Sequence, residues 1–445
     1  MHFVTEYGAL QRPRGHPTLT PVNLRQTLTG YFDFAVAAAG AAATLPGKLP
    51  RDAPAGRTIV LGCGKAAAEM ARVARAELSG KVCGCVVTRH GHGVAKAIPG
   101  IEVIEAGHPV PDAAGFAAAQ SIMALAAQAG PGDRVIFLIS GGGSALLCAP
   151  AAGLKFAEKQ AITDHLVRSG APIEHINLVR RHLSRVKGGR LAATAGARGA
   201  ELYTYLISDV VGDDPALVAS GPSIAAPFEP EAALALLERY GGPASDVTKA
   251  AIRANLPGVP RPHPVSILAT NADALAALHS RAAADGWNVI NLGADLRGEA
   301  STTGREHAAL AHDLLRLPGR HLLISGGELT VTAASADGCG GPNLEYVAGV
   351  LAGLAPHDPI AVLAGDSDGI DGTEDNAGGF ARAGDALPEA LTKALALHRT
   401  YALFKALDGL VLTGPTRTNV NDIRMIAVGD NGEVVSPAGF EPATY

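Results

Sequence analysis

The chain has 445 residues, of which 47% are hydrophobic and 18% are charged, and its formal net charge is −5. This length exceeds what one hydrophobic core supports and suits two domains, while the apolar content excludes a disordered chain. The weakly acidic balance disfavours partners such as nucleic acid or a membrane surface. The five scattered cysteines form a poor disulfide framework, so we expect a reducing, cytoplasmic location.

Short apolar runs that end in glycine-rich polar loops recur along the chain, with helical segments between them. In chain order, the runs with their loops are residues 58–65, 134–144, 201–214, 321–328, 359–369 and 409–419. They are too short for helices and too continuously apolar for half-exposed strands, so we expect strands buried in mostly parallel sheets. The proline-rich segment Leu256–Pro264 predicts a linker between two α/β domains, residues 22–262 and 263–432, each with helices flanking its sheet.

The first glycine-rich turn matches G-x-G-x-x-[GA], with Gly62, Gly64 and Ala67 in the required places. Between a strand and a helix, this pattern brings the backbone close to a dinucleotide and makes the first domain Rossmann-like. The next predicted strand ends in Arg89 rather than in an acidic residue, which disfavours NAD and leaves NADPH open. Lys65, inside the turn, suits a phosphate or a carboxylate, although an exposed lysine on a structural turn is the alternative.

The second glycine-rich loop has the sequence SGGGS and follows an apolar run. Gly141, Gly142 and Gly143 leave backbone N–H groups free to surround an oxyanion, and Ser140 and Ser144 add hydroxyl donors. The loop therefore predicts a phosphate-binding segment, with a flexible turn as the alternative.

Charged residues also stand near predicted strand ends. Lys187 and Arg190 flank a glycine pair and could neutralise a transferring phosphoryl group, unless they lie on a solvated helix end. Asp209, Asp366 and Asp368 suit Mg²⁺ or a substrate hydroxyl, although aspartates also simply make turns. Ligands of open parallel sheets bind beyond the carboxyl ends of the strands, so we expect the active site in an interdomain cleft.

Taken together and in order, the motifs resemble those of the MOFRL-type glycerate kinases, whose relatives are sometimes labelled hydroxypyruvate reductases. They are LGCGKAA, GHPVPD, LISGGGSALL, LSRVKGGRLA, LISDVVGDDPALVASGPS, LISGGELTVT, GGPNLE, LAGDSDGIDG and GPTRTNVND, and they span roughly residues 23–430. The resemblance implies two α/β domains with the active site between them. It also implies phosphorylation of D-glycerate at the 2-hydroxyl, with ATP and Mg²⁺, to give 2-phosphoglycerate.

The residue types and the resemblance together predict the site. Catalytic roles are expected for Lys65, Asp209, Arg190 and Asp366, and metal ligation for Asp366 and Asp368. The residues expected to contact substrate or nucleotide are Gly64, Ser140, Gly141, Gly142, Gly143, Ser144, Lys187, Ser325, Gly326, Gly327, Glu328, Asn343, Asn419 and Asn421. Two positions depart from the family pattern, because Pro342 stands where arginine is common and Arg417 where a small residue is common. Arg417 could compensate for the missing arginine, or the substrate preference could differ.

Two alternative functions remain open at this point. An NADPH-dependent hydroxypyruvate reductase would use the first turn and Arg89, but it does not need the acidic strand ends, and no clear histidine–carboxylate pair is evident. A non-catalytic sensor of a sugar acid or sugar phosphate would need the anion-binding loops but not the metal carboxylates. The presence of both sets favours a kinase that acts on small molecules, and a homo-oligomer stays open.

Overall fold

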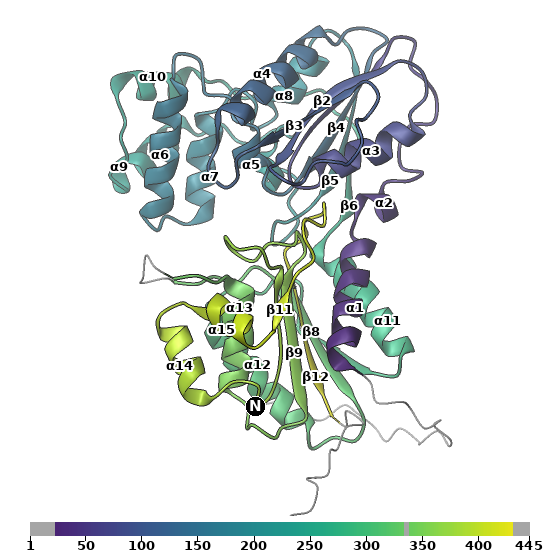
Figure 1. Ribbon diagram of the computed structural model, residues 1–445. Coiled ribbons are helices and arrows are strands. Elements are labelled where there is room, and N and C mark those ends of the chain that lie inside the picture. Colours follow the sequence, from purple (N-terminus) through teal and green to yellow (C-terminus); the bar gives the residue numbers. More distant parts are fainter. Residues whose placement is uncertain (1–22, 333–337, 430–445) are drawn as a thin grey trace, which may run out of the picture.

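The computed structural model describes residues 23–332 and 338–429, which form two six-stranded sheets with helices packed around each (Figure 1). The first sheet consists of β1 (Thr58–Cys63), β2 (Val82–Arg89), β3 (Ile101–Ala106), β4 (Arg134–Ser140), β5 (Glu201–Ile207) and β6 (Val265–Ala269). Its order is β3-β2-β1-β4-β5-β6, and all neighbouring strands are parallel. This is the Rossmann strand order, and the predicted α/β class with a parallel first sheet is confirmed.

The central strands of this sheet are mostly apolar because helices cover both of their faces. Val60 of β1 packs in one core cluster with α3 (Ala67–Glu77). Its neighbours Ile59 and Leu61 point to the opposite face, in a second cluster with α4 (Ala113–Gln128) and α8 (Arg190–Gly196). Successive side chains of a strand alternate between faces, so a strand that is buried on both sides is apolar at most positions, and the polar residues of β1 and β4 stand at the strand ends.

A helical layer extends from one side of the first sheet (Figure 1). It is built from α6 (Phe156–Arg168), α7 (Ile173–His182), α9 (Pro230–Arg239) and α10 (Asp246–Ala254), which share a separate apolar cluster. The short helices α2 (Ala41–Thr44) and α5 (Gly143–Leu146) and a 3₁₀ turn, Val218–Ser220, complete the first half. Because α5 directly follows β4, the predicted phosphate loop lies between the sheet and the helical layer.

The second sheet is mixed, which corrects the expectation of a second mostly parallel sheet. Its strands are β7 (Asn288–Asn291), β8 (His321–Gly327), β9 (Ile360–Asp366), β10 (Gly378–Arg382), β11 (Leu410–Val411) and β12 (Asp422–Val428), in the order β11-β10-β9-β12-β8-β7. Among the described strands, β7 and β8 are parallel, whereas every other neighbouring pair is antiparallel. The physical reason is that β12 lies between β8 and β9 and runs opposite to both, while β10 runs opposite to β9 and β11.

Helices α12 (Ala300–Leu314) and α13 (Pro342–Ala352) pack on one face of the second sheet, with α14 (Pro388–Ala396) and α15 (Thr400–Ala406) beside α13. The other face is covered by α11 (Asn271–Ala284) and, unexpectedly, by α1 (Leu24–Ala38), the first described helix (Figure 1). In the described part of the chain, no helix is long and apolar enough to cross a membrane.

The sheets therefore do not divide at the expected boundary between residues 262 and 263. Strand β6 pairs with β5 in the first sheet, although it follows the proline-rich segment. The α1 helix precedes the first sheet in sequence but packs against β9 of the second. Residues 22 and 430–432 of the expected domain bounds lie outside the described residues.

Candidate active site

Two rims of loops face each other across the junction of the sheets. We call the segments after β1, β4 and β5 the first rim, and the segments after β8 and β9 with the segment before β12 the second rim. Lys65 Nζ of the first rim lies 2.5 Å from Asp368 Oδ2 of the second. Asn419 Nδ2 donates a hydrogen bond of 3.1 Å to Asp209 Oδ2. The structure thus brings together four of the predicted site residues from segments far apart in sequence.

The turn that carries Lys65 is held against the loop after β4. Gly64 has a φ of +123°, and a Cβ at this position would collide with the carbonyl and hydroxyl oxygens of Ser140. The Lys65 N–H donates to the Gly141 carbonyl at 2.8 Å, and the Ala66 N–H donates to Ser140 Oγ at 2.9 Å. Only glycine allows this close approach, so the loops after β1 and β4 form one rigid unit.

The charge of Lys65 is stabilised by carboxylates from both rims. Burial alone would lower the pKa of this lysine, but Asp368, Asp366 and Asp209 outweigh it and hold the pKa above its usual range. Burial in turn raises the pKa of Asp209. Asp209 also lies so close to Gly141 that a Cβ there would collide with its carboxylate. Lys65 is therefore a cation fixed in the middle of an acidic site.

Asp366 and Asp368 form the acidic end of β9. The Asp368 N–H donates to Asp366 Oδ1 at 2.9 Å. Burial and then the charge of Asp368 raise the pKa of Asp366 well above its usual range, whereas Lys65 lowers the pKa of Asp368 against the effect of its burial. A divalent cation would relieve the repulsion between the two carboxylates.

The described residues contain no group of three or more His, Cys, Asp or Glu side chains that could hold a metal. Mg²⁺ needs fewer protein ligands than such a group provides, because it usually binds one or two carboxylates together with substrate phosphates and keeps several waters. The pair of Asp366 and Asp368 fits that requirement.

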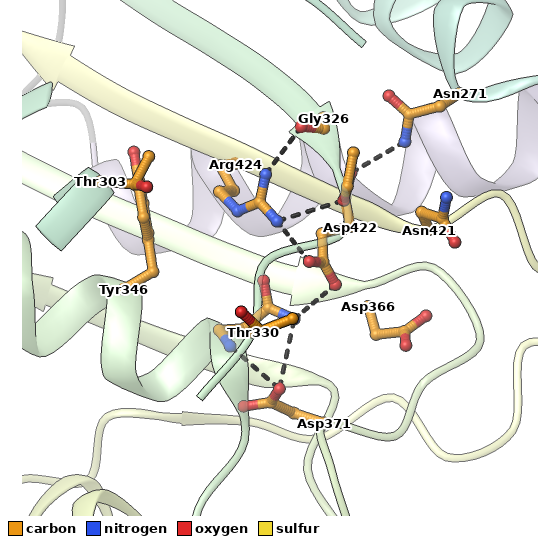
Figure 2. Close-up of polar contacts among 12 residues, drawn as sticks. Asn271, Thr303, Gly326, Thr330, Tyr346, Asp366, Asp371, Asn421, Asp422 and Arg424 are labelled. Atoms are coloured by element: carbon orange, nitrogen blue, oxygen red, sulfur yellow. Dashed lines mark hydrogen bonds and ion pairs between the residues drawn. The ribbon is translucent and has the colours of Figure 1, made fainter. Parts of the chain in front are cut away.

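A buried polar network supports the second rim (Figure 2). Asn343 Nδ2 donates to Asp422 Oδ1 at 2.7 Å and to Asp371 Oδ1 at 3.3 Å. Arg424 contacts the other oxygen of Asp422 and donates to the Gly326 carbonyl at 2.8 Å. Asn343 is only 1% exposed, so it braces the rim from inside and does not face the gap.

Asp422 joins the rim because of the direction of β12. In the register of the sheet, Asp422 pairs with Gly327 at the end of β8 and with Asp366 at the end of β9. An antiparallel strand places its amino end beside the carboxyl ends of its neighbours. The sequence analysis missed Asp422 and Arg424, although two charged residues inside the otherwise apolar DIRMIAV are a signal of paired, buried charges.

The remaining predicted residues of the loop after β8 have different surroundings. Ser325 is 1% exposed and hydrogen bonds Tyr346 in the core. The carbonyls of Gly326 and Gly327 accept from Arg424. The side chain of Glu328 is exposed, but partial loss of hydration, followed by the negative charges of Asp422 and Asp209, raises the pKa of its carboxyl group.

Asn421 borders a cavity of about 200 Å³ between the rims. The cavity is also lined by Ser208 and Asp213 of the first rim and by Asn271 of α11. Asn421 has a φ of +66°, which asparagine tolerates better than most residues. Its backbone conformation thus directs the chain from the rim into β12.

Lys187 and Arg190 have separate environments, although both were predicted to act on phosphate. Lys187 Nζ donates to Ser144 Oγ at 3.1 Å and to the Ala219 carbonyl at 3.2 Å, so this lysine lies beside the glycine-rich loop. The Arg190 guanidinium donates to the backbone carbonyls of Arg181, Lys187, Asn255 and Leu256. These bonds use Arg190 to anchor a loop, and the structure does not bring it to the rims.

Two histidines, the buried His92 and the half-buried His108, were not predicted to belong to the site. Both ring nitrogens of His92 and the Nδ1 of His108 have no hydrogen-bond partner within the described residues. The Nε2 of His108 lies 3.1 Å from where a Cβ on Gly142 would be. Burial, with a contribution from the positive Lys65, lowers the pKa of His92 to about 4 and of His108 to about 3. Both rings are therefore neutral near pH 7 and can accept or donate a hydrogen bond.

The two departures from the family pattern have a structural explanation. Pro342 is the first residue of α13. This position suits proline, because a backbone N–H there would have no acceptor within the helix. Arg417 reaches across the gap and donates to the Gly93 carbonyl at 2.8 Å. Burial is the main cause of the lowered pKa of His92, and the positive charge of Arg417 lowers this pKa further. Lys65 lowers it as well, whereas Asp368 raises it. An arginine therefore approaches the rims from position 417.

Comparison with protein families matches residues 27–255 to DUF4147, a domain of unknown function, and residues 321–422 to the MOFRL family. The chain belongs to the MOFRL family. It is 40% identical over 442 residues to an Agrobacterium vitis protein with a provisional hydroxypyruvate reductase name, covering 94% of this chain and 98% of that one. It is 36% identical to a glycerate 2-kinase of Pyrococcus horikoshii, covering 83% and 86%.

This MOFRL protein also resembles a solved chain along nearly its whole length. The crystal structure of a glycerate kinase from Thermotoga maritima superposes with a TM-score of 0.80 at 32% identity, covering 91% of this chain and 99% of the other. The family resemblance that the motifs indicated is thus confirmed. The names of the relatives nevertheless fall into two reaction classes, a reductase and a kinase.

Proposed function

We propose that this protein phosphorylates D-glycerate at its 2-hydroxyl with ATP and releases 2-phosphoglycerate and ADP. The observation that carries the proposal is the buried Lys65, held between a glycine-rich loop and the carboxylates of Asp366 and Asp368. Phosphoryl transfer asks a protein mainly for positioning and for neutralisation of charge. Relatives named as glycerate kinases, one of them a solved structure, support the kinase class.

The roles of the residues follow from their positions. Lys65 would stabilise the charge that develops on the transferring phosphoryl group. Asp366 and Asp368 would hold Mg²⁺, which supplies further charge neutralisation at phosphate oxygens. Asp209, held by the Asn419 amide, would orient the glycerate hydroxyl or accept its proton. Contacts that join the rims, such as Lys65 with Asp368, would exclude water from the reacting groups.

A specific observation disfavours the reductase alternative. A Rossmann turn binds the dinucleotide pyrophosphate through free N–H groups at the start of the following helix. Here the Lys65 N–H is bonded to the Gly141 carbonyl and the Ala66 N–H to the Ser140 hydroxyl. The turn therefore uses these donors to bind its neighbouring loop. A sensor of sugar acids, in turn, would have no use for the paired carboxylates Asp366 and Asp368.

The test is a product assay with purified protein, ATP, Mg²⁺ and D-glycerate that resolves 2-phosphoglycerate from 3-phosphoglycerate. L-glycerate and a chelator serve as controls for stereochemistry and for the metal. A parallel reaction contains NADPH and hydroxypyruvate. We expect ATP-dependent 2-phosphoglycerate; oxidation of NADPH without any phosphoglycerate would refute the proposal in favour of the reductase.

A further inference from the structure

Cationic side chains gather behind the glycine-rich loop, outside the residues assigned above to the reacting centre. Lys159 comes from α6, Arg180 from α7, and Lys187 from the segment before α8. Together with Ser144 they line one narrow recess of about 10 Å³. Lys159 is 4% exposed and Lys187 is 1% exposed, so their charges are withdrawn from bulk solvent. Neither Lys159 nor Arg180 lies in a motif that marks the site in the sequence.

Among the described residues, no carboxylate balances these cations. Within residues 23–332 and 338–429, none of the three forms an ion pair, and the groups that act on them electrostatically are other cations and the thiols of Cys63 and Cys148. Lys187 donates to Ser144 and to a carbonyl, and Lys159 Nζ lies 3.5 Å from the Ala149 carbonyl. These neutral acceptors satisfy hydrogen bonds but leave the positive charges uncompensated.

Uncompensated buried charges of one sign are unfavourable. Burial, followed by repulsion from Lys159, lowers the pKa of Lys187 to about 7. An anion with several negative charges would remove that cost, and charged hydrogen bonds would hold it. Glycerate carries a single negative charge, whereas the polyphosphate of a nucleotide carries several. The opposite rim presents Asp366 and Asp368, which would repel a polyphosphate in the absence of a metal.

We propose that Lys159, Arg180 and Lys187 bind the polyphosphate of the nucleotide beside Ser144, so that the first domain is the nucleotide-binding domain. This inference rests on the proposed kinase function and adds the side on which the nucleotide lies. A recess of about 10 Å³ has room for roughly one water-sized atom. A single phosphoryl oxygen therefore enters it, and the remaining phosphate lies over the glycine-rich loop, toward Lys65.

The experiment measures the dissociation constants of inorganic tripolyphosphate and of ADP by titration calorimetry. The variants are Lys159→Met and Arg180→Met, which remove charge while keeping side-chain bulk. The matched control is Arg168→Met, since Arg168 is on the same helix as Lys159 but its side chain is 82% exposed. We expect both ligands to bind about ten- to a hundredfold more weakly to the two cluster variants, the cost of one charged hydrogen bond, and to be unchanged by the control.

Thermal unfolding confirms that each variant is folded, and the KM for D-glycerate should stay within about twofold of wild type. Unchanged tripolyphosphate affinity in both cluster variants, or no binding by the wild type, would overturn the inference. A selective rise in the KM for D-glycerate would also overturn it, because the cluster would then bind the acid substrate. Tripolyphosphate binding needs no phosphoryl transfer, so its loss in the variants beside an inactive wild type would support the anion site while refuting the kinase.

Discussion

Replacing Lys65 by methionine removes the cation that joins the two rims while keeping most of the side-chain volume. In the wild type, its Nζ lies 2.5 Å from Asp368 Oδ2. Loss of one preorganised charge that stabilises a transition state costs about 2.7–4 kcal/mol, or about 10²- to 10³-fold in turnover. We therefore expect kcat for ATP-dependent phosphorylation of glycerate to fall by at least that factor.

The same substitution also affects stability, and the two effects must be separated. Breaking a buried ion pair by removing one partner costs about 3–5 kcal/mol at most, because the remaining carboxylate can take up a proton. Turnover is therefore measured at a temperature where unfolding curves show each variant to be folded. Product is quantified as phosphoglycerate per active chain under saturating ATP and Mg²⁺.

Arg134→Met is the matched control for loss of a buried, paired cation. Arg134 has a side chain only 4% exposed, bonds Glu201 at 2.8 Å and Asp52 at 3.0 Å, and stands at the start of β4, opposite the rims. We expect this variant to lose stability but to keep turnover within a few-fold of wild type. Near-normal turnover in Lys65→Met, or an equal loss in both variants, would refute the catalytic role of Lys65.

Further predictions concern the turn, the cation cluster and the unusual arginine. Gly64→Ala should lower the free energy of unfolding, measured by urea titration, by about 1–3 kcal/mol, because its Cβ would meet Ser140. Gly47→Ala, at a φ of +73° with no atom within 4 Å of its Cβ, should lower that free energy by less. The pKa of Lys187 falls from 10.5 to about 7 on folding, so the unfolded chain binds this proton more tightly. The free energy of unfolding should therefore rise with pH between these values. Lys187→Met should flatten this dependence in denaturant titrations at several pH values. Arg417→Met should reduce turnover about tenfold or more with little change in melting temperature, and unchanged kinetics would show that this arginine does not replace the one absent at the start of α13.

Much of the site could be predicted because parallel strands share a direction. When an apolar run ends in a glycine-rich polar loop, the loop must lie at the carboxyl edge of the sheet, whatever the order of the strands. That rule placed Lys65, Ser140 and Asp209 on one edge before the sheet order was known. It also placed Asp368 correctly, since β8 and β9 point in the same direction even though they are not neighbours.

The direction and partners of the remaining strands depend on contacts that a local pattern does not contain. The charged residues of DIRMIAV indicate paired, buried charges, but they give neither the direction of the strand nor its neighbours. Arg424 is tolerated in the sheet through its bonds to Gly326 and Asp422. The docking of α1 on the second sheet is equally non-local. Arg190 shows the same limit for a site residue: its spacing from a glycine pair resembles that of Lys187, and only the fold turns its donors toward backbone carbonyls.

The antiparallel insertion of β12 also explains why the rims differ in charge. The amino end of β12 adds Asp422 to an edge that already carries Asp366 and Asp368. Arg424, inside the sheet, neutralises only Asp422. The loop after β4 in the first rim instead lies beside the cations Lys159 and Lys187. Lys65 projects from this basic side into the acidic one. A phosphoryl group bound on the first rim would thus lie close both to Lys65 and to the carboxylates that would hold a metal, so the two rims would share the neutralisation of its charge.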